Sequence, residues 1–281
     1  MRNPLLRTES QKKKSRRQSS ATSHGCGVFT SQPFGGNHDT PDQQRNHGWL
    51  RYCSWIILLS LSLPTLANAS DEVELALTAI GTGAAVELKS RLITDRITVF
   101  NDEARAQAIA ALPAALRDQR VTQGKLLRRI EPVLAQVLQL HERTRTSQQP
   151  ALFLFEHEFP TAQLWRGCVL LVSTGLAEPL YDGELAGIFA HELSHAYFED
   201  EMAAAQRQQA AQAMRIVELK CDAVAILSVK LLGYNPALYL KGLQRIQTIN
   251  KQKSRSSGLF QSHPEFVARA QFSERLIQSL S

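Results

Sequence analysis

The chain has 281 residues and a hydrophobic fraction of 43%, which is enough for one or two folded domains. Its 32 Lys and Arg residues outnumber its 26 Asp and Glu residues, and its pI is near 9.3. Residues 1–69 contain nine of the basic and three of the acidic residues, so residues 70–281 hold 32 − 9 = 23 basic and 26 − 3 = 23 acidic residues. Because that part is formally neutral, the high pI does not indicate a nucleic-acid partner.

The N-terminal 69 residues have the composition of a leader. Residues 1–50 are basic and polar with almost no apolar periodicity, so they cannot bury enough surface to fold. A basic flank at Arg51, an apolar run over residues 55–63 and a small-x-small motif ending at Ala69 then predict a secretory signal peptide that is cleaved after Ala69. We therefore expect an exported protein. The alternative is an uncleaved N-terminal membrane anchor.

Apolar residues recur with helical spacing along most of the remaining chain, and glycine and proline mark the breaks. Two short apolar runs predict neighbouring strands of a small sheet. The second strand could bind an extended substrate by pairing along its edge. The predicted strands cover residues 151–155 and 168–173. The predicted helices cover residues 71–92 (interrupted at 81–83), 103–117, 124–143, 201–232, 237–251 and 265–280, with one more beginning at 182 and a polar loop over 251–258. This pattern predicts a mostly helical domain of the α+β class.

Residues 191–195 read His-Glu-Leu-Ser-His and fall in the helix that we expect to begin at Asp182. Positions four apart in a helix lie about 6 Å apart along its axis and on the same face, so His191 and His195 could bind one cation. Glu192 is rotated away from that face and could instead take a proton from an attacking water molecule. The alternative is a structural pair of histidines.

A zinc site that catalyses hydrolysis needs a third protein ligand and keeps one position open. Glu218 is the best choice, because it lies in a segment with helical spacing of apolar residues and has Asp222 one turn further on. A buried Asp222 could accept the free N–H of a histidine ligand, and we expect this histidine to be His191. Glu218 could also be an ordinary solvated helix residue.

The other histidines and cysteines of this part have simpler interpretations. We expect His141 on a helix surface and His157 facing solvent at the end of a strand. Cys168 and Cys221 could form a disulfide, or could both be small buried residues, and the sequence does not decide between these.

Three segments together resemble the gluzincin family of zinc metallopeptidases, of the type of the CAAX prenyl endopeptidases and HtpX, and most closely its soluble periplasmic BepA- and LoiP-like members. The segments are the 191–195 motif, the pair Glu218 and Asp222, and the upstream run from Gly167 to Leu176. The resemblance covers roughly residues 120–281. It implies a zincin-like metallopeptidase domain there, preceded by a helical segment over residues 70–119 and the leader over residues 1–69.

The resemblance also implies roles for individual residues. His191, His195 and Glu218 would bind Zn²⁺, Glu192 would be the catalytic base, and Asp222 matches the acid that supports a histidine ligand. Ser262-His263-Pro264, followed by Arg269, resembles a late motif of the family. His263 would then lie near the zinc ion, where it either polarises the substrate or fills the open position in a resting state.

Two departures from the family pattern concern substrate preference rather than the metal. Residues 161–164 replace the Asn-Ala-Phe-Ala that relatives often have, and Asp200 stands where many have a further histidine. The implied function is a zinc-dependent metalloendopeptidase, located in the periplasm, that cleaves unfolded or misassembled envelope proteins, with membrane-associated partners left open. The alternatives are a periplasmic chaperone or assembly factor with a latent zinc site, and a purely structural zinc domain. Glu192 counts against the last of these, because a structural site needs no base.

Overall fold

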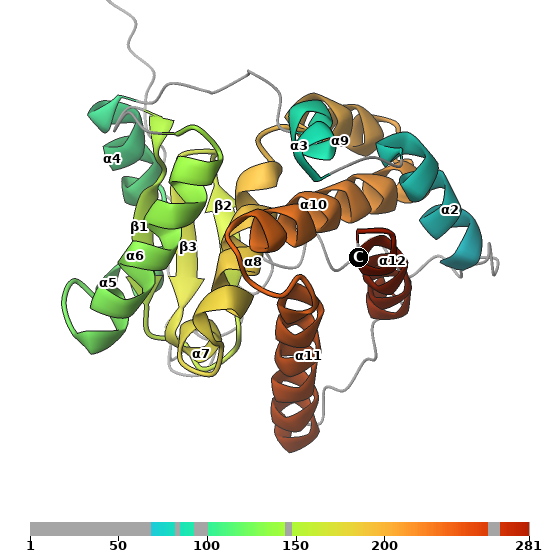
Figure 1. Ribbon diagram of the computed structural model, residues 1–281. Helices are drawn as coiled ribbons and strands as arrows, with labels where there is room; N and C mark the ends of the chain where they lie inside the picture. Colours follow the sequence, from blue (N-terminus) through green and yellow to red (C-terminus); the bar gives the residue numbers. More distant parts are fainter. Residues whose placement is uncertain (1–68, 82–84, 93–100, 144–147, 258–264, 281) are drawn as a thin grey trace, which may run out of the picture. The chain divides into compact units, whose positions relative to one another are not determined.

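Where the structure describes the chain, apolar residues with helical spacing form helices, and the short apolar runs belong to a three-stranded sheet (Figure 1). This is the α+β class that the sequence predicts. The computed structural model describes residues 69–81, 85–92, 101–143, 148–257 and 265–280, all within the unit His47–Ser281. The predicted leader up to residue 68 and the predicted site residue His263 lie outside the described residues. Among the described helices, none is both long and apolar enough to cross a bilayer.

The sheet has the strand order β1-β3-β2. Strands β1 (Ala151–Phe155) and β3 (Val169–Ser173) pair in the parallel direction, with the register running from Ala151↔Val169 to Phe155↔Ser173. The sequence predicted both strands and that they are neighbours. Strand β2 (Ala162–Trp165) was not predicted, and it pairs with β3 in the antiparallel direction. Because β3 is the middle strand, both of its edges are already paired. The expectation that β3 could bind a substrate along its edge is therefore wrong.

The two faces of the sheet belong to different hydrophobic clusters. One face packs on α6 (Lys125–Leu140) and α8 (Asp182–Ser194), and the other on α4 (Asp102–Ala110) and α5 (Ala114–Asp118). The side chains of the first face are Leu154, Leu170 and Val172, and those of the second are Phe153, Phe155, Val169 and Leu171. Since β3 is covered on both faces, it reads as a continuous apolar run rather than an alternating one.

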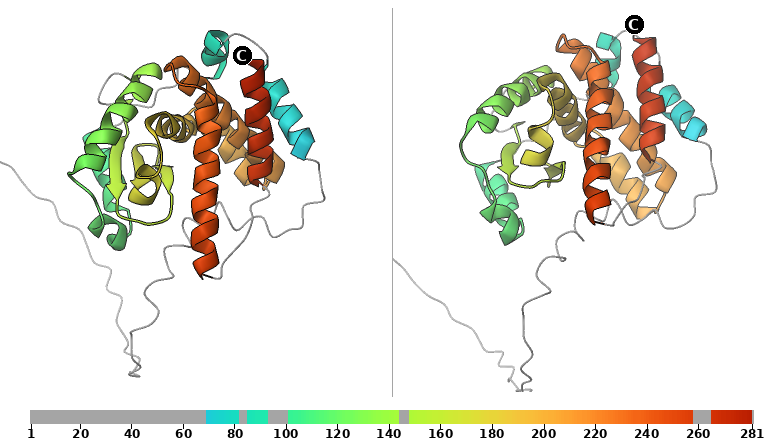
Figure 2. Two further views of the ribbon diagram at one scale, coloured as in Figure 1. Left: turned by 60° about the horizontal axis from the view of Figure 1, so that its bottom comes forward. Right: turned by 90° about the horizontal axis from the view of Figure 1, so that it is seen from below.

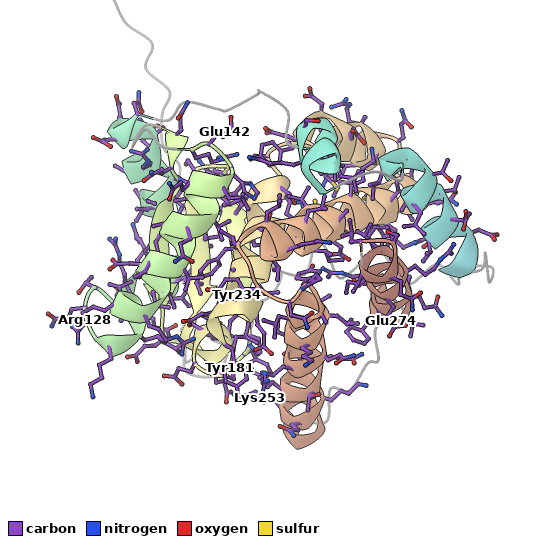
Figure 3. The ribbon with its side chains drawn as sticks, in the orientation of Figure 1. Arg128, Glu142, Tyr181, Tyr234, Lys253 and Glu274 are labelled. Atoms are coloured by element: carbon purple, nitrogen blue, oxygen red, sulfur yellow. The ribbon has the colours of Figure 1, made fainter. Side chains whose placement is uncertain are left out.

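A second group of helices packs around α10 (Ala211–Leu231), which also has an extensive contact with α8. Helices α11 (Ala237–Ser257) and α12 (Glu265–Ser279) contact each other, and the rotated views show them side by side (Figure 2). The charged side chains of Arg128 in α6, Glu274 in α12 and Glu142 in the turn after α6 are exposed (Figure 3). The other helices of the described residues are α2 (Ala69–Ile80), α3 (Ala85–Leu92), α7 (Thr174–Ala177) and α9 (Glu199–Arg207).

Three predicted helix boundaries are wrong, each for a local reason. The helix expected over residues 103–117 is interrupted before Pro113, which cannot donate a backbone hydrogen bond. The long helix expected over residues 201–232 is divided into α9 and α10, where Gln209 adopts a left-handed φ of 52°. The polar loop expected from residue 251 is helical up to Ser257, because polar residues continue α11 without a breaker.

Cys168 and Cys221, the cysteines within the described residues, are free and buried, and they lie in different hydrophobic clusters. They therefore act as small buried residues, which was one of the two alternatives. The expected surface position of His141 is wrong, since its side chain is 0% exposed. Its Nδ1 lies 3.0 Å from the Tyr197 hydroxyl and its Nε2 lies 2.9 Å from Ser228 Oγ. His157 is half-buried, with its Nδ1 3.3 Å from the backbone oxygen of Phe159.

We expect acid to destabilise the fold through His141. Burial, together with the positive charges of Arg143 and Lys89, lowers the pKa of His141 from 6.5 to about 3. The imidazole in the unfolded chain binds its proton near pH 6.5, so between these two pKa values the unfolded state binds more protons and stability falls with falling pH. Each pH unit corresponds to about 1.4 kcal/mol, so the loss between pH 6.5 and 4.5 is roughly 2–3 kcal/mol.

Urea unfolding of the wild type and of His141→Gln at pH 7 and at pH 4.5 checks this expectation. Glutamine keeps hydrogen-bonding groups at this position but does not titrate. The wild type should lose about 2–3 kcal/mol more of its unfolding free energy than the variant on acidification. Equal losses in the two proteins would show that His141 does not titrate in this way.

Candidate metal centre

Helix α8 presents both histidines of the motif. The helix begins after Tyr181, whose backbone N–H donates to Glu184 Oε2 at 2.8 Å, and it ends at Ser194. His195 is the first residue after the helix but keeps helical backbone angles, with φ −55° and ψ −28°. The two imidazoles therefore leave the same side of the chain, and their ring centroids lie 5.1 Å apart at an interplanar angle of 86°.

Helix α10 crosses α8 and brings Glu218 to the two imidazoles. Glu218 Oε2 lies 3.4 Å from His191 Nε2, and Oε1 lies 4.0 Å from His195 Nε2. One ligand atom from each of the three residues can be chosen so that all lie within 4.8 Å of one another. Each can therefore reach a single small cation, so this group could hold a metal ion.

The charges of the group also fit a cation. Burial alone would lower the pKa of His191, but hydrogen bonds with Asp222 and Glu218 outweigh burial and raise the pKa to about 9. Burial favours the neutral form of Glu218, but His191 holds its pKa below the usual range. At neutral pH a proton on His191 thus provides positive charge beside two carboxylates. A metal cation can replace that proton, so metal affinity should decrease in acid.

Asp222 contacts His191 on the side away from Glu218. Its Oδ1 lies 2.9 Å from His191 Nδ1, which is the contact that the sequence led us to expect. The carboxylate is 0% exposed and accepts two hydrogen bonds from Arg269 of α12, from Nε to Oδ2 at 2.9 Å and from Nη2 to Oδ1 at 2.6 Å. In the neutral form of His191 with its proton on Nδ1, the lone pair of Nε2 is directed toward Glu218, where a metal would bind.

A tyrosine completes this network. The Tyr239 hydroxyl of α11 donates to Asp222 Oδ1 at 2.6 Å and lies 3.1 Å from His191 Nδ1. Burial disfavours the charged form of Asp222, yet Arg269 and His191 hold the pKa of its carboxyl well below its usual range. Burial and the Asp222 charge raise the pKa of Tyr239, so its hydroxyl keeps its proton at neutral pH.

Glu192 lies beside the His-His-Glu group and contacts strand β2 of the sheet. Its Oε2 accepts the backbone N–H of Leu164 in β2 at 3.2 Å. Burial raises the pKa of the Glu192 carboxyl, while the nearby imidazoles of His195 and His191 oppose this rise. A carboxylate with a raised pKa holds a proton more readily than an ordinary glutamate, which suits proton transfer.

The structure brings together five of the six residues that the sequence singled out, and His263 lies outside the described residues. Cys221 lies on the other side of His195, with its Sγ 3.7 Å from Nδ1 rather than from Nε2. It therefore does not belong to the group of possible ligands. Sequence reasoning missed the contacts of Tyr239, of Arg269 and of the Leu164 amide. One signal for these contacts was present in the sequence, which is that Arg269 follows the late His-Pro motif of residues 263–264.

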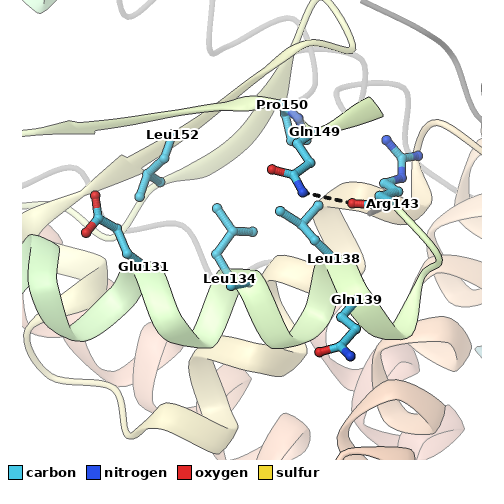
Figure 4. A pocket seen from close by; sticks show the side chains of 9 residues that line it. Glu131, Leu134, Leu138, Gln139, Arg143, Gln149, Pro150 and Leu152 are labelled. Atoms are coloured by element: carbon cyan, nitrogen blue, oxygen red, sulfur yellow. Dashed lines mark hydrogen bonds between the residues drawn. The ribbon is translucent and has the colours of Figure 1, made fainter. Parts of the chain in front are cut away.

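A separate pocket of about 430 Å³ lies between α6 and β1 (Figure 4). Leu134, Leu138 and Leu152 supply its apolar lining, and Gln149 Nε2 donates to the backbone oxygen of Arg143 at 3.0 Å. The pocket shares no residue with the His-His-Glu group. Its leucines belong to the packing of α6 on the sheet, so we place the candidate site at the metal group.

No protein-family model matches the sequence, and comparison with curated proteins finds no significant match. The functional assignment therefore depends on the residues of this site and on their geometry.

Proposed function

We propose that this protein is a zinc-dependent metalloendopeptidase of the gluzincin type. The observation that carries the proposal is the group of His191, His195 and Glu218, with Glu192 beside it but outside it. Two imidazole nitrogens and one carboxylate oxygen form a ligand set that zinc adopts in catalytic sites, with one position left for substrate or water. A structural zinc site would instead close all four positions with protein ligands.

The residues of the chain divide the work of peptide hydrolysis among them. When bound, a zinc ion supplies Lewis-acid chemistry, polarising a substrate carbonyl and lowering the pKa of water. Glu192 takes the proton of the attacking water on its carboxylate and passes it to the departing amine. Asp222 holds the proton of His191 on Nδ1, so that Nε2 stays free to bind the metal.

The position of Glu192 supports an extended polypeptide as substrate. Strand β2 ends the strand order, so its second edge has no strand partner among the described residues. An extended peptide that pairs with this edge would pass close to Glu192. Together with the predicted signal peptide, this favours unfolded or misassembled envelope proteins as substrates, in a periplasmic quality-control role.

Chelation tests the proposal. The purified protein with zinc should cleave an unfolded, fluorescently labelled substrate protein, removal of the metal by a chelator should abolish the cleavage, and added zinc should restore it. Cleavage that continues in the metal-free protein would contradict a metallopeptidase. A zinc-loaded protein that binds unfolded chains without cleaving any of them would contradict the peptidase activity but not the metal site.

A further inference from the structure

One buried hydroxyl beside the metal group has no part in the proposed hydrolysis. The Tyr239 side chain is 0% exposed, and its hydroxyl is enclosed by three polar partners. It donates to Asp222 Oδ1 at 2.6 Å, accepts from Arg269 Nη2 at 3.0 Å, and lies 3.1 Å from His191 Nδ1. The hydroxyl proton of Tyr239 and one of its oxygen lone pairs are used in the first two contacts. The second lone pair of the oxygen is therefore the group that can accept the N–H of His191.

The ring of Tyr239 is held as firmly as its hydroxyl. It stacks on the imidazole of His191 with ring centroids 6.3 Å apart and an interplanar angle of 20°. On α8, one turn before His191, Gly187 leaves the room that the ring needs. A Cβ added at Gly187 would lie 2.8 Å from Cδ2 of Tyr239, which real Cβ contacts do not reach. The absence of a side chain at residue 187 therefore lets α11 approach α8 closely enough for this stacking.

We propose that Tyr239 is a positioning residue that fixes the ring plane and the Nδ1–H tautomer of His191 from the side opposite Glu218. The inference rests on the proposed metal site, and it adds a residue from α11 that the motif does not contain. Asp222 alone fixes one proton of His191. Asp222 and Tyr239 together define both the direction of that N–H and the plane of the ring, so Nε2 is directed at Glu218 before a metal arrives.

Tyr239 does not act on the substrate in this arrangement. Its hydroxyl lies on the Nδ1 side of His191, whereas Glu218 and any bound metal lie on the Nε2 side. Its full burial also keeps it from a polypeptide that lies along β2. Loss of the hydroxyl should therefore weaken metal binding first, because a metal must then itself order a ligand that was previously held in place.

The test measures the zinc dissociation constant of the full protein by competition with a chromophoric chelator. Tyr239→Phe removes only the hydroxyl, and we expect zinc to bind about tenfold more weakly. Tyr234→Phe is the matched control, because Tyr234 is half-buried near Gly183 and outside the network. This control should bind zinc as the wild type does. Unchanged affinity in Tyr239→Phe would overturn the inference, as would a loss of hydrolysis at unchanged zinc affinity.

Two further measurements keep the inference testable if Tyr239→Phe folds poorly. Gly187→Ala should displace the ring and weaken zinc binding by at least as much as Tyr239→Phe. In the zinc-loaded wild type, nitrogen-15 spectra of histidine should show His191 as the Nδ1–H tautomer with a slowly exchanging proton, and a rapidly exchanging proton would overturn the inference. A wild-type protein that binds no zinc would instead contradict the proposed function itself, so the two failures are distinguishable.

Discussion

Replacing Glu192 with glutamine is expected to abolish peptide hydrolysis while zinc binding is retained. Glutamine has the same shape as glutamate, and its side-chain oxygen can still accept the backbone N–H of Leu164. It cannot take a proton, so the step that activates the water is lost. General-base catalysis contributes about 10²- to 10⁴-fold, and we expect a loss of rate in that range. Cleavage of an unfolded substrate and zinc content should both be measured.

Glu199→Gln is a matched control for this experiment. Glu199 is exposed in the first turn of α9 and lies outside the metal group, so the same chemical change there should leave both rate and zinc content unaltered. Hydrolysis by Glu192→Gln at the wild-type rate would contradict the assignment of the base. Loss of zinc in that variant would indicate that Glu192 binds the metal.

Replacing Asp222 with alanine is expected to have the largest effect on stability. The carboxylate is fully buried and is paired with Arg269, His191 and Tyr239, so its removal leaves these partners without their acceptor. Breaking a buried ion pair costs about 3–5 kcal/mol. The Arg269 side chain is 23% exposed and can regain some water, so we expect about 3 kcal/mol. Zinc affinity should also fall by about 10- to 100-fold, because His191 loses the acceptor that orients it.

The pH dependence provides a further check on Asp222. Because folding lowers the pKa of this carboxyl from its usual 3.8, its contribution to stability is present at neutral pH and is lost as pH falls below about 4. Urea unfolding at pH 7 and at lower pH, without zinc, measures this. Asp118→Ala, a change at an exposed residue, should have little effect. An Asp222→Ala variant as stable as the wild type at pH 7 would contradict the role of the network.

The spacing of residues along the helices predicted the centre of the site, and the structure shows why. His191 and His195 are four residues apart, as are Glu218 and Asp222, and one helical turn places such side chains on the same face. Such local periodicity does not depend on the rest of the fold. The crossing of α8 and α10 then needed only their apolar faces to meet, since most residues of both helices are buried.

The parts that the sequence did not predict depend on contacts between distant segments. Strand β2 is four residues long and half-buried throughout, so it has no alternating pattern. It forms by pairing with the edge of β3 that β1 leaves open. Tyr239 is separated from Asp222 by 17 residues and a turn, and it reaches the site because Gly187 lets α11 approach α8. Neither feature has a signal in a single sequence, because both result from the tertiary packing of elements.

The most direct test of the central claim is the position of zinc in crystals of the purified protein, determined from anomalous diffraction on both sides of the zinc absorption edge. The account predicts one strong peak within bonding distance of His191 Nε2, His195 Nε2 and the Glu218 carboxylate, with Glu192 outside the coordination sphere. A peak elsewhere, or no peak in a protein crystallised with excess zinc, would contradict it.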